Sequence, residues 1–125
     1  LVRKMAQRYG ITDCRGTKYL VDEHDRFTGE VEQMWDAKSK RGAIDHFVQK
    51  YEIDLDASYA YGDTMGDLSM LELVGNPVAI NPTRELLSHL ADQPTLREKV
   101  RVAVERKDVI YMLRPDVETF RAYEE

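Results

Sequence analysis

The stretch Ser58-Tyr59-Ala60-Tyr61-Gly62-Asp63-Thr64-Met65-Gly66-Asp67-Leu68-Ser69-Met70-Leu71-Glu72 decides how the rest of the chain is organised. It opens with a short β-prone run that ends in Gly62-Asp63, and a second acid, Asp67, follows four residues later. Apolar residues then recur at Leu68, Leu71 and Val74, the three-residue step of one helix face. The stretch therefore predicts a strand, a tight turn and a helix, with both acids on the turn.

These two acids are expected at the carboxyl end of the strand, where open α/β sheets bind their ligands. Carboxylate oxygens suit Mg²⁺, which usually keeps several waters and takes one or two protein carboxylates. The alternative is that Asp63 forms the turn and Asp67 caps the helix, because Asp side chains readily bond to nearby backbone N–H groups. The Gly-Asp-x-x-x-Asp pattern fits both interpretations.

The composition describes one domain of 125 residues with a formal charge of −5. Lys and Arg are scattered among the acids, which argues against a nucleic-acid partner. No apolar run approaches membrane-spanning length, so no membrane partner is expected either. The single Cys14 excludes an internal disulfide and favours a cytoplasmic, reducing setting. Residues 1–8 already form a helical pattern without an N-cap, so we expect the chain to be part of a longer one.

Patterning along the chain predicts strands that alternate with helices, and hence an α/β fold with a doubly wound parallel sheet and a β-hairpin. The hairpin is expected at 17–21 and 27–31, and the sheet strands at 59–61, 78–80 and 109–113. Helices are expected at 1–9, 42–51, 68–74, 84–90, 94 to about 106, and 115–123.

A cation for a phosphate group is available at Lys40, which lies at the start of the predicted helix before the key strand. Lys is a point charge that neutralises a phosphoryl group, and a helix N-terminus adds its own attraction for anions. Lys38 and Arg41 are neighbouring candidates for the same role. The competing interpretation is a solvated basic linker.

Lys40, Asp63 and Asp67, followed by Pro77-Val78-Ala79-Ile80-Asn81-Pro82, resemble the haloacid dehalogenase superfamily. The spacing from Lys40 to Asp63 is most similar to the branch that contains phosphoserine phosphatase. The resemblance covers residues 1–90 and implies that residues 1–125 are the carboxyl-terminal part of such a hydrolase domain. Residues 91–125 form an unassigned tail of that domain, and residues 97–125 carry no family motif.

The resemblance implies a role for each matching residue. Lys40 is expected to pair with the nucleophile and to bind the phosphate, together with Gly66 and Asn81 as substrate-binding positions. Asp63 is expected to ligate Mg²⁺, and Asp67 to hold a metal-bound water or the lysine. The family reaction forms an aspartyl-phosphate that water then hydrolyses, so the implied substrate is a small phosphorylated metabolite.

The chain departs from the family pattern in two ways. It contains neither the family's Asp-x-Asp-x-Thr/Val nucleophile motif nor its Ser/Thr motif, and Asp54-Leu55-Asp56 precedes the key strand instead of ending one. At the key turn, phosphoserine phosphatases have a pattern similar to Gly-Asp-Gly-x-Asn-Asp. This chain has Gly66 at the position of the Asn. The expectation is a phosphate-monoester hydrolase whose present chain lacks the nucleophile and is inactive alone.

Other functions remain open from the sequence. One is a non-catalytic module or subunit that binds metal or phosphate, and another is a receiver-like phosphoacceptor domain. In the family fold the nucleophile strand lies beside the strand at 59–61, so we expect that edge to be exposed here. Self-association through the exposed sheet edge, or repair of the gap by the strand at 109–113, is the expected consequence.

Overall fold

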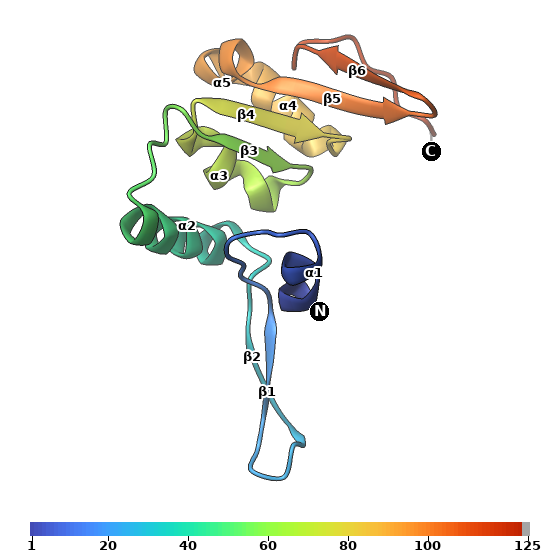
Figure 1. Ribbon diagram of the computed structural model, residues 1–125. Coiled ribbons are helices and arrows are strands. Elements are labelled where there is room, and N and C mark those ends of the chain that lie inside the picture. The colour runs from blue at the N-terminus through green and yellow to red at the C-terminus, as the bar shows by residue number, and fades with distance from the viewer. Residues whose placement is uncertain (124–125) are drawn as a thin grey trace.

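The computed structural model describes residues 1–123 of the chain. An amino-terminal helix and a long β-hairpin precede a four-stranded sheet with its helices (Figure 1). The elements are α1 Val2–Arg8, β1 Lys18–Val21, β2 Phe27–Glu32, α2 Ala37–Tyr51, β3 Tyr59–Gly62, the 3₁₀ turn η1 Met65–Asp67, α3 Leu68–Leu73, β4 Asn76–Ile80, α4 Arg84–Asp92, α5 Pro94–Lys99, β5 Arg101–Arg106 and β6 Val109–Leu113.

The sheet has the strand order β3-β4-β5-β6. β3 pairs with β4 and β4 with β5 in parallel, whereas β6 returns antiparallel to β5. Gly62 is in register with Ala79, and Ala79 with Val102, so β3 and β4 end at the same edge. The expected α/β class with parallel strands is confirmed, although β6 makes the sheet mixed, and the turn that carries both acids lies at the carboxyl end of β3.

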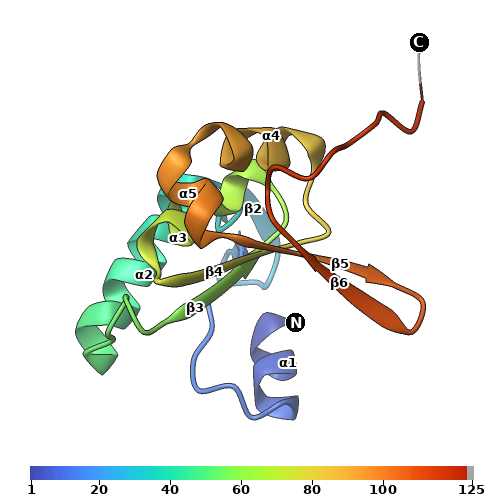
Figure 2. The ribbon, with the colours of Figure 1, turned by 90° about the horizontal axis from the view of Figure 1, so that it is seen from above.

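The core lies between the sheet and the helices α3, α4 and α5, which cover the same side of it (Figure 2). Successive strand residues point to opposite faces, so Ala60 is buried under the helices while Tyr61, its neighbour, is 56% exposed on the other face. Three leucines of α3 and α4 are completely buried, and each stabilises the fold by roughly 1.5–3 kcal/mol. These leucines are Leu71, Leu86 and Leu90.

The β-hairpin at β1 and β2 is confirmed and projects away from the sheet (Figure 1). The Asp22 carboxylate accepts hydrogen bonds from the backbone N–H groups of His24 and Arg26, and Asp25 between them has a positive φ of 59°. Asp tolerates this left-handed conformation better than most residues. The tip is therefore built by local side-chain-to-backbone bonding.

Two helix predictions for the carboxyl-terminal third of the chain are wrong. The predicted helix from 94 to about 106 ends at Lys99, and 101–106 form β5. Val102 and Val104 are β-branched and prefer a pleated surface, and Val102 is buried between β4 and β6. The predicted helix at 115–123 is absent, since residues 114–123 form only turns and irregular structure.

The strand at 109–113 is confirmed as β6, but it does not repair the edge at β3. It pairs with β5, at the opposite end of the sheet. Lys107, with a positive φ of 53°, makes the tight turn that returns the chain along β5. Within residues 1–123, β3 is hydrogen-bonded to a strand on one side only.

Candidate functional site

The turn after β3 folds the Asp67 side chain back over the strand end. Asp67 Oδ2 accepts hydrogen bonds from the backbone N–H groups of Asp63 at 3.0 Å and Thr64 at 3.3 Å. A Cβ at Gly62 would lie 2.4 Å from Asp67 Cβ, closer than such atoms approach. Gly62 is therefore required for this arrangement, in which Asp67 forms a capping box with Thr64 at η1 instead of capping α3 with its side chain.

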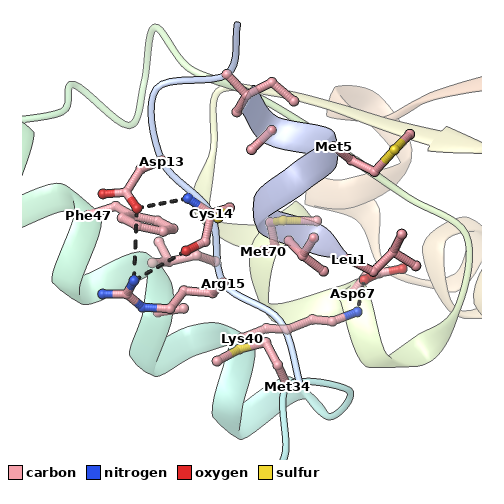
Figure 3. A pocket seen from close by; sticks show the side chains of 15 residues that line it. Leu1, Met5, Asp13, Cys14, Arg15, Met34, Lys40, Phe47, Asp67 and Met70 are labelled. Carbon is pink, nitrogen blue, oxygen red and sulfur yellow. Dashed lines mark hydrogen bonds and ion pairs between the residues drawn. The ribbon is translucent and has the colours of Figure 1, made fainter. Parts of the chain in front are cut away.

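Lys40 reaches the same carboxylate from α2. The Asp36 side chain caps this helix by accepting a hydrogen bond from the Ser39 N–H at 2.7 Å, and the Lys40 N–H donates to the Asp36 carbonyl at 3.1 Å. Lys40 thus lies in the first turns, and its Nζ donates to Asp67 Oδ1 in an ion pair (Figure 3). The lysine and the second acid are in direct contact.

The environment keeps Asp67 ionised. Asp67 is only 6% exposed, and this burial raises the pKa of its carboxyl. The hydrogen bond from Lys40 and those from the Asp63 and Thr64 N–H groups stabilise the charged form and outweigh burial, so the net pKa lies below its ordinary value. A negative charge held this way fixes the Lys40 ammonium at the end of β3.

Asp63 and Asn81 occupy the same sheet edge with different partners. The Asp63 side chain is exposed, and the backbone carbonyl of Asp63 accepts a hydrogen bond from the Thr83 N–H at 2.9 Å. Asn81 follows β4 with a positive φ of 43°, and its Oδ1 accepts from the Glu105 N–H at 2.9 Å. The Asn81 side-chain oxygen is therefore bonded to β5, and within residues 1–123 no hydrogen bond joins Asn81 to the Lys40–Asp67 pair.

The site offers few side-chain ligands for Mg²⁺. Among residues 1–123, no three His, Cys, Asp or Glu side chains are grouped so that they could hold a metal ion. Asp63 offers an exposed carboxylate, whereas three N–H donors already occupy most of the roughly four acceptor positions of Asp67. A Mg²⁺ ion that takes one protein carboxylate and several waters fits this donor set, and Asp63 is the residue that would hold it.

An apolar groove of about 660 Å³ runs from the Lys40–Asp67 pair along α1 and α2 (Figure 3). Its far end is formed by the segment after α1, where Asp13, Cys14 and Arg15 lie together. The apolar lining comes from α1, α2 and α3 and includes Met5, Ile44, Phe47 and Met70. The ion pair therefore lies at one end of this apolar groove.

Sequence reasoning missed the polar cluster around Asp13. The Asp13 carboxylate accepts hydrogen bonds from the Tyr51 hydroxyl at 2.7 Å and from Lys50 Nζ at 3.0 Å. These bonds, with one from the Cys14 N–H, hold the pKa of Asp13 well below its usual range. Because Asp13 and Tyr51 are 38 residues apart, no local spacing in the sequence signals the contact.

Comparison with known proteins identifies the family. The family model described as haloacid dehalogenase-like hydrolase matches residues 1–72. This match covers more than half of the chain and includes Lys40, Asp63 and Asp67. The chain belongs to the haloacid dehalogenase-like hydrolase family, as its resemblance at these residues predicted.

Two relatives are similar to the chain over about 70% of its length. The chain is 36% identical over 86 residues to an inhibition of morphological differentiation protein of Streptomyces azureus. The matched residues make up 69% of this chain and 31% of that protein. The chain is 34% identical over 90 residues to phosphoserine phosphatase SerB1 of Mycobacterium tuberculosis, covering 70% and 29%. The chain thus spans about a third of the length of these relatives.

The fold is also similar to that of a solved structure. The chain is similar to a substrate-bound phosphoserine phosphatase complex with a TM-score of 0.58 and 23% identity, over 86% of this chain and 46% of that one. This likeness confirms the expected partial domain of the α/β type. In the part of the chain that the structure describes, no helix has the length and apolar character needed to cross a membrane.

Proposed function

We propose that the chain is the carboxyl-terminal part of a Mg²⁺-dependent phosphate-monoester hydrolase that acts on a small phosphorylated metabolite. The observation that carries this proposal is the Lys40–Asp67 ion pair beside the exposed Asp63, at the carboxyl end of β3. A fixed cation and a free carboxylate at this edge suit a phosphoryl group and its metal ion. The phosphatase name of one relative and the family membership support the same reaction class.

Each site residue has a proposed role. Lys40 binds and neutralises the phosphoryl oxygens, and Asp67 holds its ammonium in place. Asp63 would hold Mg²⁺, which, when bound, supplies further positive charge to the phosphoryl oxygens. Gly66 and Asn81 complete the proposed substrate-binding positions, and Gly66 lies next to Lys40. Asn81 is the weaker member because its side-chain oxygen is bonded to β5.

The proposed chemistry of the whole protein is a two-step transfer. A carboxylate oxygen forms a bond to phosphorus while the bond to the substrate oxygen breaks, and water then releases inorganic phosphate from the aspartyl-phosphate. Asp67 does not serve as this nucleophile, because its oxygens accept bonds from Lys40 and two backbone N–H groups. We therefore propose that the present chain binds and positions without carrying out the attack.

A non-catalytic module is the second candidate. The observation that favours this candidate is that, within residues 1–123, no third His, Cys, Asp or Glu side chain is grouped with Asp63 and Asp67. Such a module would bind metal or phosphate at the same residues without turning over a substrate. A receiver-like phosphoacceptor is a third reading, in which Asp63 itself would accept a phosphoryl group.

Binding of inorganic phosphate tests the proposal. Calorimetric titration of the chain with phosphate in the presence of Mg²⁺ is expected to show binding that Lys40→Met weakens at least tenfold. Lys38→Met is the matched control, since Lys38 lies two residues away in the same helix and is exposed. Equal phosphate affinity in wild type and Lys40→Met would contradict the proposed role of the ion pair.

A further inference from the structure

Gly66 is in close contact with the segment that leads into α2. A Cβ built on Gly66 would lie 2.9 Å from the Trp35 carbonyl oxygen, 3.5 Å from Thr64 Oγ1 and 4.0 Å from Lys40 Nζ. The positive-φ glycines among the described residues are Gly10 and Gly29, so the backbone at Gly66 is one that any residue adopts. What Gly66 provides is room for a backbone carbonyl.

That carbonyl stands at the start of the helix that carries Lys40. Trp35 directly precedes Asp36, the residue that caps α2 with its side chain and accepts the Lys40 N–H with its carbonyl. A hydrogen bond also ties the first turn of α2 to α3, because Ser69 Oγ donates to the Ala37 carbonyl at 3.2 Å. The place of the Trp35 carbonyl therefore sets where α2 begins and from where the Lys40 side chain extends.

We propose that Gly66 is a positioning residue for Lys40: its missing side chain lets η1 approach the Trp35 carbonyl, and this contact holds the ammonium of Lys40 against Asp67. The inference rests on the proposed function in that Lys40 is the cation for phosphate. Gly66 acts on the substrate through Lys40, since the approach of two backbone segments determines where the ammonium lies.

Substitution by Ala makes the dependence measurable. The obstructing atom is a backbone oxygen, so it cannot rotate away as the tip of a side chain would, and the segment around Trp35 has to shift. Gly42 in α2 offers a matched control, because a Cβ there meets no atom within 4 Å. Both changes restrict the unfolded chain equally, so the difference between them reports the contact at Gly66.

Two readouts that involve no phosphate follow the contact in the full chain. Trp35 is the only tryptophan, so its fluorescence reports the segment before α2. Acylation of Lys40 relative to Lys38, measured by mass spectrometry, reports how well the Lys40 ammonium is held. We expect Gly66→Ala to shift the Trp35 emission and to raise relative labelling of Lys40 several-fold, and Gly42→Ala to change neither.

Unchanged relative labelling of Lys40 in folded Gly66→Ala would overturn the proposal. Lys40→Met supplies the reverse test, including the case in which Gly66→Ala fails to fold. If Gly66 places the helix, Lys40→Met leaves the Trp35 emission unchanged. If the emission shifts in Lys40→Met, the ion pair places the helix and the proposal is wrong. Neither result depends on phosphate binding, so a failure of this proposal is distinguishable from a failure of the proposed function, which the phosphate titration tests.

Discussion

Lys40 and Asp67, 27 residues apart in the sequence, form an ion pair at the carboxyl end of β3 in which the carboxylate is almost fully buried. Asp67 also accepts two backbone N–H bonds from the turn that precedes it. The pair joins α2 to the strand–turn–helix unit. Its loss is expected to affect both the stability of that junction and the charge available to a phosphoryl group.

Removing the Lys40 ammonium is expected to destabilise the fold. Lys40→Met keeps much of the side-chain volume but leaves the buried Asp67 carboxylate without its charged donor, and a buried polar group that loses its partner costs about 1–3 kcal/mol. Urea unfolding should show this decrease, while Lys38→Met, which alters an exposed side chain, should stay close to wild type. Adding Asp67→Asn to Lys40→Met should recover part of the loss, because the unpaired charge is then removed. A further loss would contradict this explanation.

The cluster around Asp13 predicts a dependence of stability on pH. Hydrogen bonds from Tyr51, Lys50 and the Cys14 N–H lower the pKa of Asp13 in the folded chain. A carboxyl with a depressed folded pKa stabilises the fold above its unfolded pKa of about 3.9, and that contribution is lost as the pH falls through the folded pKa. Asp13→Asn should therefore lower the free energy of unfolding at pH 7.

The measurement for Asp13 is urea unfolding of wild type and Asp13→Asn between pH 7 and pH 3. The difference in unfolding free energy between the two chains should be constant above about pH 5 and shrink toward pH 3. Asp116→Asn, which changes an exposed carboxylate paired with Arg114 at 3.6 Å, is the control. A difference that grows with falling pH would contradict the assignment.

The isolated chain is expected to have no phosphatase activity. With an aryl phosphate and Mg²⁺, release of the phenol should not exceed that of Asp63→Asn, because the binding groups remain but the sequence lacks the family's nucleophile motif. Continuous absorbance of the released phenol measures this directly. Turnover well above Asp63→Asn would make Asp54 or Asp56 candidates for the nucleophile, although both lie in the loop before β3.

The exposed edge of β3 is expected to associate with a second copy of the chain. β3 pairs only with β4 among the described strands, and its side chains Tyr59 and Tyr61 are exposed. Unpaired ladder groups beside apolar side chains are a template for strand pairing. Sedimentation velocity should show concentration-dependent association that Tyr59→Lys reduces. Tyr19→Lys in the hairpin is the control, and a monomer at every concentration would argue against this interface.

Local pattern predicted the part of the fold in which sequence neighbours make the structure. Gly62, Asp63 and Asp67 lie on one strand–turn–helix unit, so their spacing alone placed them at a strand end. The contact of Asp13 with Tyr51 depends on how the segment after α1 returns to α2, and no spacing encodes it. Residues 101–106 carry charges at both ends, which fits a helix as well as a strand, and only pairing with β4 and β6 decides for β5.

The close approach of Gly66 to Trp35 likewise lay beyond the sequence. A glycine in a Gly-Asp-x-x-x-Asp turn indicates a need for backbone freedom, yet the backbone at Gly66 requires none. Its value comes from a carbonyl 31 positions earlier in the chain, brought there by α2. The sequence could identify which residues carry charge, while tertiary packing determines how firmly they are held.

Titration of the chain with Mg²⁺ by calorimetry measures whether the turn after β3 holds the ion. We propose that the exposed Asp63 carboxylate at the carboxyl end of β3 holds Mg²⁺, while Lys40 holds Asp67. We expect weak Mg²⁺ binding that Asp63→Ala weakens at least tenfold and that Asp56→Ala, which removes an exposed acid from the loop before β3, leaves unchanged. Mg²⁺ affinity that is the same in wild type and Asp63→Ala would contradict this assignment.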